Sequence, residues 1–379
     1  MRILIIGAGV SGLFIAYELL KRGLREVLVL DAKAPGYGAS LRNIGCFRSS
    51  FTSREHVLLM KESIAKWLEI KRDWGVFIEQ RGYLWIARRE DTLDVFRELA
   101  KFHNSHGVPT RVIGVDELSS REPYINTSIV KGALFDPTAG KMSVIEVFTE
   151  LYIRVKKMGG IIIPHTPVER LVSSGGVVKS ALTPRGEYTA DVFVVAAAEG
   201  SRKILESIGV NAPIEPSPRH PLVTEPYAEV IKSGLVIDWD TPGSPHITQT
   251  QHGSIILARD IKDEPWMPLN SQRHDAFEKI IKPLSELYPF LRNVNVNRYW
   301  MGYYDMTPDH HPIYGPVKPF ENLYIAAGFS GHGLMMAPIT GVLIADWILH
   351  GRPRINVAEN LVLERFETGR LVKEIAVVG

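Results

Sequence analysis

The chain has 379 residues, 45% of them hydrophobic and 23% charged, which is typical of a folded protein with about two domains and excludes disordered and fibrous classes. Its 44 lysine and arginine residues nearly balance 42 aspartate and glutamate residues, without a basic block, so we expect no nucleic-acid partner. Cys46 is the single cysteine, which excludes an internal disulfide and the paired thiols of zinc and iron–sulfur sites. We predict no metal site.

No apolar run approaches the roughly 20 residues of a membrane-spanning helix. The apolar stretch 3–6 is followed at once by glycines, unlike the core of a signal peptide. We therefore expect a cytoplasmic protein, with a peripheral position on the inner face of the membrane as the remaining option.

The N-terminal residues predict a βαβ unit: a strand at 2–6, a helix at 10–22 and a strand at 27–31. Gly7, Gly9 and Gly12 fit the pattern GxGxxG directly after the first strand, and Asp31 ends the second. Such glycines let the backbone approach a pyrophosphate at the helix N-terminus, and the carboxylate accepts hydrogen bonds from a ribose. The unit predicts a dinucleotide site but does not distinguish NAD from FAD. The alternative is a plain glycine turn with Asp31 as a cap.

Helices and strands alternate in the next part of the chain. After a loop of small residues at 36–45, a helix with Val57, Met60 and Ile64 on one face begins at a capping box of Thr52 and Glu55. A strand at 83–87 and a helix from Asp91 to Gly107 follow. A helix from Met142 to Gly159 then leads to short strands that we assign to the nucleotide-binding sheet: 161–163, 168–172, 177–182 and 192–196.

Residues 215–300 are richer in Pro, His and Trp and indicate a second domain, with strands at 246–250 and 254–258 and a helix at 273–287. The chain then returns to a strand at 323–327, a second glycine turn and a helix from Pro338 to Gly351. The N-terminus of that helix suits a flavin pyrimidine ring, where negative charge collects on reduction. This favours FAD. The alternative is an ordinary strand-to-helix connection.

These elements predict an α/β protein: a discontinuous Rossmann-like FAD-binding domain (1–50, 141–214 and 310–379) and a mixed α+β substrate domain on an antiparallel sheet (51–140 and 215–309).

Nearly end to end, the sequence resembles the D-amino-acid-oxidase-like flavoproteins, which include sarcosine oxidase and glycine oxidase. The motifs that carry the resemblance are GAGVSG at 7–12, the small-residue loop at 38–45, GYYDMTPD at 302–309 and GFSGHG at 328–333. Within the family the chain is most similar to the catalytic β subunit of archaeal dye-linked L-proline dehydrogenases, with which it also shares MMAP at 335–338.

The resemblance implies FAD as cofactor. The residues that it and the glycine motifs place around FAD are Gly7, Gly9, Val10, Ser11, Gly12, Asp31, Ala32, Lys33, Ala39, Ser40, Arg42, Asn43, Gly45, Val168, Ala197, Gly200, Gly302, Gly328, Phe329, Ser330, Gly331, His332, Gly333 and Leu334. On the substrate side it implies Arg48 as the partner of a substrate carboxylate and Tyr304 as an active-site tyrosine, with Trp300 and His252 on flanking segments. A structural histidine and a surface or phosphate-facing arginine are the plainer interpretations of His252 and Arg48.

Two departures refine these expectations. Gly302 occupies the place where monomeric sarcosine oxidases carry the cysteine that binds flavin covalently, so we expect noncovalent FAD. No lysine lies between Lys232 and Lys262, where those oxidases carry one that promotes reaction with oxygen, so a dehydrogenase is favoured.

We therefore expect oxidation of the C–N bond of a small amino acid, L-proline first, with hydride passing to flavin N5 and electrons to a dye, a quinone or a partner flavoprotein. Sarcosine, glycine or D-amino-acid oxidation stays open, as do a 2-hydroxy-acid substrate and an NAD-linked enzyme. An FAD-holding subunit of a larger electron-transfer complex is a further alternative, and both homo- and hetero-oligomers are compatible with the sequence.

Overall fold

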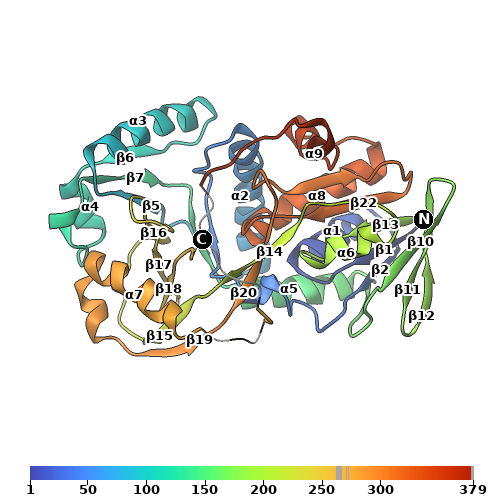
Figure 1. The fold of residues 1–379 in the computed structure, drawn as a ribbon, viewed down its shortest axis with the longest axis horizontal. Helices are drawn as coiled ribbons and strands as arrows, with labels where there is room; N and C mark the ends of the chain where they lie inside the picture. The colour runs from blue at the N-terminus through green and yellow to red at the C-terminus, as the bar shows by residue number, and fades with distance from the viewer. Residues whose placement is uncertain (262–266, 270, 272, 377–379) are drawn as a thin grey trace.

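The computed structural model describes residues 1–261, 267–269, 271 and 273–376, which form two lobes side by side (Figure 1). The first lobe is built on a mostly parallel sheet, in which β21 alone of the described strands is antiparallel to its neighbour. In spatial order this sheet contains β21 (Ile313–Pro316), β22 (Leu323–Ala327), β13 (Val192–Val195), β1 (Arg2–Ile6), β2 (Glu26–Leu30) and β9 (Ile161–Ile163).

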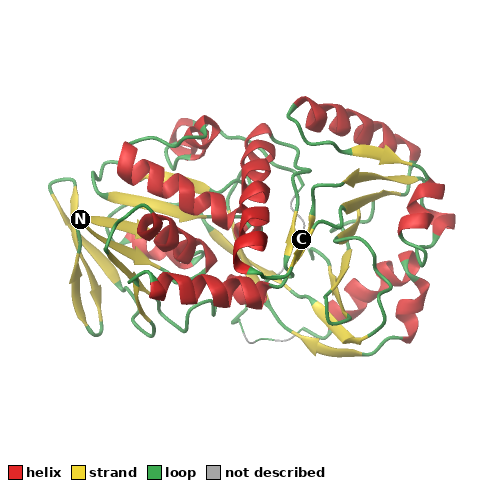
Figure 2. Ribbon diagram, turned by 180° about the vertical axis from the view of Figure 1, so that it is seen from behind, coloured by secondary structure: helices red, strands yellow, loops and turns green. Residues whose placement is uncertain are grey.

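Helices cover this parallel sheet, as Figure 2 shows from behind. They are α1 (Val10–Lys21), α5 (Val144–Lys157), α6 (Gly200–Glu206) and α8 (Gly333–His350), with α9 (Arg365–Thr368), η1 (Ala39–Arg42) and η4 (Asn356–Leu361) as short additions. The strands of the sheet read as continuous apolar runs because both of its faces are buried. The predicted Rossmann-like architecture is confirmed.

The strands expected at 168–172 and 177–182 do form, but not in the nucleotide-binding sheet. They belong to a separate antiparallel sheet at the outer end of the first lobe, made of β10 (Arg170–Ser174), β11 (Val177–Thr183) and β12 (Gly186–Thr189). The two-residue turns Gly175–Gly176 and Pro184–Arg185 favour antiparallel pairing of neighbours in sequence.

The second lobe is built on a larger sheet that is antiparallel apart from the parallel pair β16 and β5 among its described strands. Its spatial order is β19 (Val296–Tyr299), β15 (Leu222–Pro226), β18 (Ser254–Ala258), β17 (His246–Gln249), β16 (Leu235–Asp238), β5 (Tyr83–Ala87), β7 (Gly132–Asp136) and β6 (Arg111–Ile113). The helices of this lobe are α3 (Glu90–Ser105), α4 (Val115–Arg121), α7 (Asp275–Leu287), η2 (Thr127–Ile129) and η3 (Pro289–Asn293).

Two small strand groups lie where the lobes meet. One is a ribbon of β14 (Glu215–Arg219) and β20 (Gly302–Met306), and the other contains β3 (Cys46–Phe47), β8 (Gly140–Met142) and β4 (Ile78–Glu79). Figure 1 shows β14 and β20 in the middle of the molecule, between the two large sheets. The chain crosses between the lobes at these strands.

Helix α2 (Arg54–Trp74) differs from its sequence assignment to the second domain. Its apolar face packs with α1 and α8 in the core of the first lobe, and the Trp67 indole donates to the Met335 carbonyl at 2.9 Å. In both overall views α2 stands between the two lobes (Figures 1 and 2). An apolar stripe in the sequence of a helix shows that one of its faces is buried, but it does not show which part of the protein covers that face.

Two helix starts also differ from expectation. Ser53, not Thr52, caps α2 and accepts a hydrogen bond from the His56 N–H. Helix α8 begins at Gly333, and Pro338 lies inside it. Among the described residues, α8 is the one helix long and apolar enough to cross a membrane, but 78% of its apolar window is buried, as in a core helix.

Candidate active site

A cavity between the lobes encloses about 1080 Å³, including solvent space at its mouth. The first glycine turn, the loop at 39–44 and the second glycine turn line it from the first lobe. The wall from the second lobe and the connecting ribbon consists of Arg219, His220, Pro221, His246, Ala258, Arg259, Asp260, Gly302, Tyr303, Tyr304 and Asp305.

The first glycine turn fits a dinucleotide. A Cβ at Gly7 would overlap the Ala196 carbonyl, and a Cβ at Gly12 would overlap the carbonyl of Gly7, so no side chain can replace these hydrogens. Gly9 lines the cavity, and its missing Cβ leaves the N-terminus of α1 open there. The backbone thus reaches the cavity without a side chain in between, as the pyrophosphate of a dinucleotide requires.

Asp31 closes the same turn from the end of β2. One oxygen of its carboxylate accepts the Ala8 N–H at 2.7 Å and the other accepts the Lys33 N–H at 2.8 Å. Burial raises the pKa of Asp31, and the two N–H donors oppose that shift. Each oxygen keeps a lone pair, so the group suits ribose hydroxyl donors.

The small-residue loop packs directly on this turn. The Ser40 hydroxyl accepts the Val10 N–H at 2.9 Å, and the Arg42 guanidinium lies over the Tyr37 ring at 4.6 Å. Ser40 therefore occupies a donor that would otherwise be unpaired at the N-terminus of α1. The loop and the helix end form one wall of the cavity.

The second glycine turn is held by the ribbon of β14 and β20. The Asp305 carboxylate accepts the Gly328 N–H at 2.7 Å, and the Tyr304 ring packs so closely on Gly331 that a Cβ there would overlap it. Burial raises the pKa of Asp305 to about 7. The GYYD and GFSGHG motifs are thus parts of one site, although 22 residues lie between them in sequence.

The structure brings many of the predicted residues together. Those that line the cavity are Gly9, Val10, Ser11, Ala39, Ser40, Arg42, Asn43, Gly302, Tyr304, Phe329, Gly331, Gly333 and Leu334. Those that do not line it are Gly7, Gly12, Asp31, Ala32, Lys33, Gly45, Arg48, Val168, Ala197, Gly200, His252, Trp300, Gly328, Ser330 and His332. Several of the latter, such as Gly7, Gly12 and Gly328, shape the turns themselves.

Arg48 lies elsewhere than its expected role requires. Its side chain is fully buried outside the cavity lining, where it donates to the Ser50 carbonyl at 2.9 Å and to the Ala376 carbonyl at 2.5 Å. The guanidinium also stacks on Phe51 at 3.7 Å. Its fork is therefore engaged by main-chain oxygens, and this placement does not support a clamp for a substrate carboxylate.

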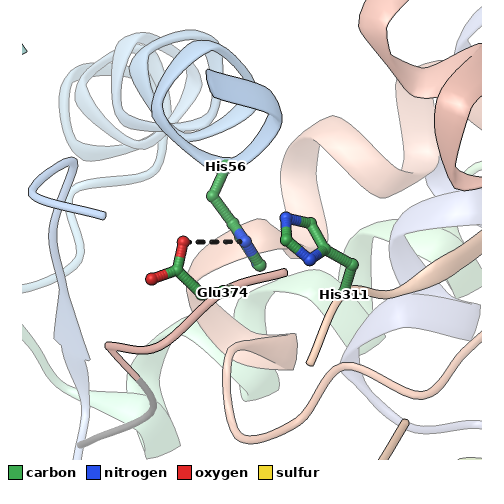
Figure 3. Close-up of side chains that lie close together, drawn as sticks. All are labelled: His56, His311 and Glu374. Atoms are coloured by element: carbon green, nitrogen blue, oxygen red, sulfur yellow. Dashed lines mark ion pairs between the residues drawn. The ribbon is translucent and has the colours of Figure 1, made fainter. Parts of the chain in front are cut away.

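Behind the cavity, Arg48 joins a buried polar network. Its Nη2 lies 3.4 Å from Nε2 of His332, whose ring packs edge-on against His56. Figure 3 shows His56 beside Glu374 and His311. One ring nitrogen of each histidine and one carboxylate oxygen of Glu374, the atoms that could bind a metal ion, lie within 4.8 Å of one another.

In this trio the carboxylate of Glu374 already has several hydrogen-bond donors. The Glu374 carboxylate accepts the N–H groups of Thr52, Ser53 and Ala376, and Nε2 of His311 lies 2.8 Å from the Ser53 hydroxyl. Burial lowers the pKa of His311 to about 3. A carboxylate with so many donors is already satisfied, so the network serves to hold the C-terminal segment in place.

His252 and Trp300 also lie outside the main cavity. Both line a second hollow. Arg42, Asn43 and Ile44 line this hollow as well as the main cavity, so the loop that contains them separates the two spaces. His252 is exposed, and the Trp300 indole donates to the Arg42 carbonyl at 3.0 Å. Trp300 thus supports the cofactor loop, whereas His252 has no contact with the main cavity.

Sequence reasoning missed the charged and polar residues of the second wall. Arg219 ends β14, and Nη2 of its guanidinium lies 3.2 Å from the carboxylate of Asp260, just after β18. Burial lowers the pKa of His246, on the same wall, to about 4, which keeps its ring neutral. No local motif marks these residues; the pairing of β14 with β20 brings Arg219 to the site.

Comparison with known proteins agrees with this geometry. Residues 2–347 match the family model described as FAD dependent oxidoreductase. The solved structure of L-proline dehydrogenase from P. horikoshii superimposes with a TM-score of 0.94 at 30% identity, covering 98% of this chain and 99% of that one. Glycine oxidase from Geobacillus kaustophilus gives a TM-score of 0.87 at 21% identity, covering 96% of this chain and 98% of that one, and shows the shared fold.

Curated relatives include the sarcosine oxidase subunit beta of Rhizobium meliloti, 26% identical, with 98% of this chain and 90% of the relative covered. The mitochondrial dimethylglycine dehydrogenase of Rattus norvegicus is 24% identical, with 94% of this chain and 44% of the relative covered. The chain thus spans less than half the length of the dimethylglycine dehydrogenases it matches. Because the family model spans most of the chain and the site has the turns that a dinucleotide needs, this protein belongs to the FAD dependent oxidoreductase family.

Proposed function

We propose that this protein is an FAD-dependent dehydrogenase that oxidises the C–N bond of a small amino acid, with L-proline as the first candidate. The observation that carries the proposal is the likeness to L-proline dehydrogenase over almost the full length of both chains. The cavity agrees with it, because one wall carries the cofactor turns and the opposite wall carries paired charges and aromatic rings.

Bound FAD supplies the hydride acceptor at flavin N5. For the transfer, the residues that line the cavity would have to hold the reacting C–H of the substrate about 3–3.5 Å from that acceptor. Tyr303 and Tyr304 narrow the cavity beside the second glycine turn, and the neutral ring of His246 adds no charge to this wall. The reacting amine must have lost its extra proton before the transfer, because an ammonium has no lone pair to support the departing hydride.

We propose noncovalent FAD and an acceptor other than oxygen: a dye or quinone-type compound, or a partner flavoprotein. The sequence between residues 233 and 261 holds no lysine. One buried lysine, Lys141, lies on the second hollow, and its Nζ donates to the Gln249 carbonyl at 2.8 Å. That bond directs the ammonium to the main chain.

Anaerobic mixing of the yellow holoprotein with a panel of amino acids tests the reaction. We expect L-proline to bleach the flavin absorbance, and we expect reoxidation to be much faster with a dye than with air. Rapid reoxidation by oxygen would instead indicate an oxidase. A flavin that no amino acid reduces would contradict the proposed activity of this chain by itself.

A second candidate is sarcosine, since a sarcosine oxidase subunit covers nearly the whole chain. That relative is one subunit of an enzyme, so it also supports the alternative of an FAD-holding subunit that acts within a larger complex. Including sarcosine and glycine in the same panel separates the candidates by the rate of bleaching. We further propose a cytoplasmic location, which cell fractionation tests.

A further inference from the structure

We infer that Arg219 and Asp260 together recognise the zwitterion of the substrate, Arg219 holding its carboxylate and Asp260 facing its amine. The inference rests on the proposed function, because it assigns the two ends of an amino-acid substrate. It replaces Arg48 as the partner of the carboxylate.

The position of Arg219 follows from strand register. Arg219 on β14 pairs with Gly302 on β20, and Ser217 pairs with Tyr304. Opposite and alternate residues of such a ribbon share one face, so this register puts the Arg219 side chain on the same face as Tyr304. Its guanidinium lies 4.4 Å from the centre of the Tyr304 ring and donates to the Ser217 hydroxyl at 2.7 Å.

The guanidinium is held in place, yet still faces the cavity. Nη1 also donates to the Pro218 carbonyl at 2.7 Å, and Nη2 forms the ion pair with Asp260. The Arg219 side chain is 14% exposed and that of Asp260 is 33% exposed, and both line the cavity. A fixed, planar fork of this kind suits a carboxylate.

The other charged side chains that line the cavity make contacts elsewhere in the protein. Arg42 lies over Tyr37 in the cofactor loop, and Asp305 accepts the Gly328 N–H. Arg259 turns away and donates to the main-chain carbonyls of Pro242 and Lys279. Among the described residues that line the cavity, Arg219 and Asp260 therefore form the pair available to a charged ligand.

Such a pair suits a ligand that carries both charges. In the empty cavity each partner compensates the other, so neither leaves a buried charge alone. A zwitterion offers a carboxylate to Arg219 and an amine to Asp260, and the total charge of the wall and ligand stays zero. A simple amine offers no group to Arg219, and a simple carboxylate offers none to Asp260. The wall therefore selects amino acids over amines and over hydroxy acids.

The test measures the concentration of ligand that half-saturates flavin reduction, or half-saturates the change in flavin absorbance for ligands that cannot reduce it. L-proline is compared with pyrrolidine, which lacks the carboxylate, and with tetrahydrofuran-2-carboxylate, which lacks the amine. Sarcosine, dimethylamine and methoxyacetate form a parallel series. FAD content and melting temperature are recorded for each variant.

Arg219→Met should raise the half-saturating concentration of the amino acid at least about 30-fold. The same variant should not weaken binding of the simple amine and should strengthen it, because the repelling guanidinium is gone and Asp260 is left free to attract it. Arg219→Lys should recover part of the loss. Asp260→Asn should weaken binding of the amino acid. It should strengthen binding of the simple carboxylate, because the negative charge of Asp260 that repels it is gone.

Arg88→Met is the matched control. Arg88 pairs with Asp238 at 2.6 Å in the same lobe, with a side-chain exposure of 19%, but neither residue lines the cavity. This variant should lower the melting temperature without changing ligand selectivity. If it changes selectivity as much as Arg219→Met does, the effect is general and the inference fails.

The outcomes separate this inference from the proposed function. If the amino acids reduce the parent flavin and Arg219→Met leaves half-saturation unchanged, the inference fails and the function stands. If Arg219→Met lowers FAD content instead, Arg219 belongs to the cofactor site and the inference also fails. If neither amino acid reduces the parent flavin, the proposed function fails and the zwitterion site falls with it.

Discussion

Cys46 shows how burial decides the chemistry of a single side chain. Its thiol is 1% exposed, lies 3.7 Å from the Gly234 carbonyl and does not line the cavity. Burial raises its pKa to about 11, so the reactive thiolate is scarce at neutral pH.

We therefore expect acid precipitation to release all the flavin into the supernatant. Cys46→Ser should release it equally, and iodoacetamide should modify the native parent slowly at pH 8 and the unfolded parent quickly. Flavin that stays on the parent pellet would contradict noncovalent binding.

Asp31 combines a structural and a binding role in one carboxylate. Replacing it with alanine removes the acceptor of the Ala8 and Lys33 N–H groups and of the expected ribose hydroxyls. Hydrogen bonds to a charged group contribute about 1.5–3 kcal/mol, so FAD affinity of the apoprotein should fall about 10- to 100-fold.

Asp191→Ala is the matched control for Asp31→Ala. Asp191 also accepts a main-chain N–H, that of Arg2 at 2.7 Å, but at the end of the sheet where β1 begins, opposite the glycine turn. In titrations of the apoprotein, the FAD affinity of Asp191→Ala should equal that of the parent. If the FAD affinity of Asp31→Ala also equals that of the parent, Asp31 does not bind FAD.

At the residue scale, local patterns predicted the cofactor turns but not the substrate wall. The turns could be predicted because each is a short glycine motif between a strand and a helix, although Gly7 and Gly331 also pack on Ala196 and Tyr304, which are distant in sequence. Arg219 and Asp260 meet only because distant strands pair, and no spacing in the sequence reveals that. Arg48 was assigned to the substrate because it follows the cofactor loop, but a sequence position does not say whether a side chain faces a cavity or the core.

At the element scale, the second glycine turn is constrained by both its backbone and its neighbour. Gly331 has φ +93°, and a Cβ there would overlap the Tyr304 ring. Gly351, which ends α8, has φ +73° with nothing within 4 Å of an added Cβ. The two glycines thus share backbone strain on substitution, while only Gly331 adds a steric clash.

Gly351→Ala should cost about 1 kcal/mol of stability and leave FAD content and substrate half-saturation unchanged. Gly331→Ala should cost more, because it also displaces Tyr304, and it should weaken substrate or FAD binding. Thermal unfolding and flavin absorbance measure these effects. If both variants behave alike, the packing of Tyr304 on Gly331 has no role in binding.

Element types were predicted better than their partners. The helix of α2 was expected from its apolar stripe, but its place in the first lobe depends on Trp67 meeting the carbonyl of Met335. Likewise β10 and β11 were expected as strands, but they pair with each other and with β12 instead of joining the parallel sheet. Periodicity defines a buried face and leaves the opposing surface open.

For the whole molecule, each of the two large sheets draws its strands from segments that are far apart in sequence. Strands of the parallel sheet come from the three segments assigned to FAD binding, and strands of the larger sheet come from the other two. The role of the C-terminal segment could not be predicted. Residues 370–376 have little regular structure, yet Glu374 and Ala376 are buried.

Glu374 anchors that segment to the start of α2. Its side chain is fully buried and accepts hydrogen bonds from the Thr52 and Ser53 N–H groups at 3.0 Å, while two residues later the Ala376 carbonyl meets Arg48. Burial raises the pKa of Glu374, but the interaction with His56 and the N–H and hydroxyl donors outweigh it and hold the pKa well below 4.5.

The sign of the resulting pH dependence follows from the lowered pKa. Glu374 stabilises the folded protein fully above pH 4.5, the usual value of such a carboxyl, and loses its contribution as the pH falls toward the lower value of the folded state. Glu374→Gln should therefore lose about 1.5–3 kcal/mol at pH 7 and show a shallower loss of stability on acidification than the parent.

Glu367→Gln, at an exposed position in α9, should reproduce the parent at every pH. Urea unfolding at pH 7 and at several values below 4.5 measures the difference, and FAD content at pH 7 shows whether the site behind the second glycine turn stays intact. If Glu374→Gln and Glu367→Gln unfold at the same urea concentration, this carboxylate does not anchor the C-terminal segment to the start of α2. If only Glu374→Gln is weakened, the tail is part of the folded core, because its buried charge is satisfied by groups that lie more than 300 residues away in sequence.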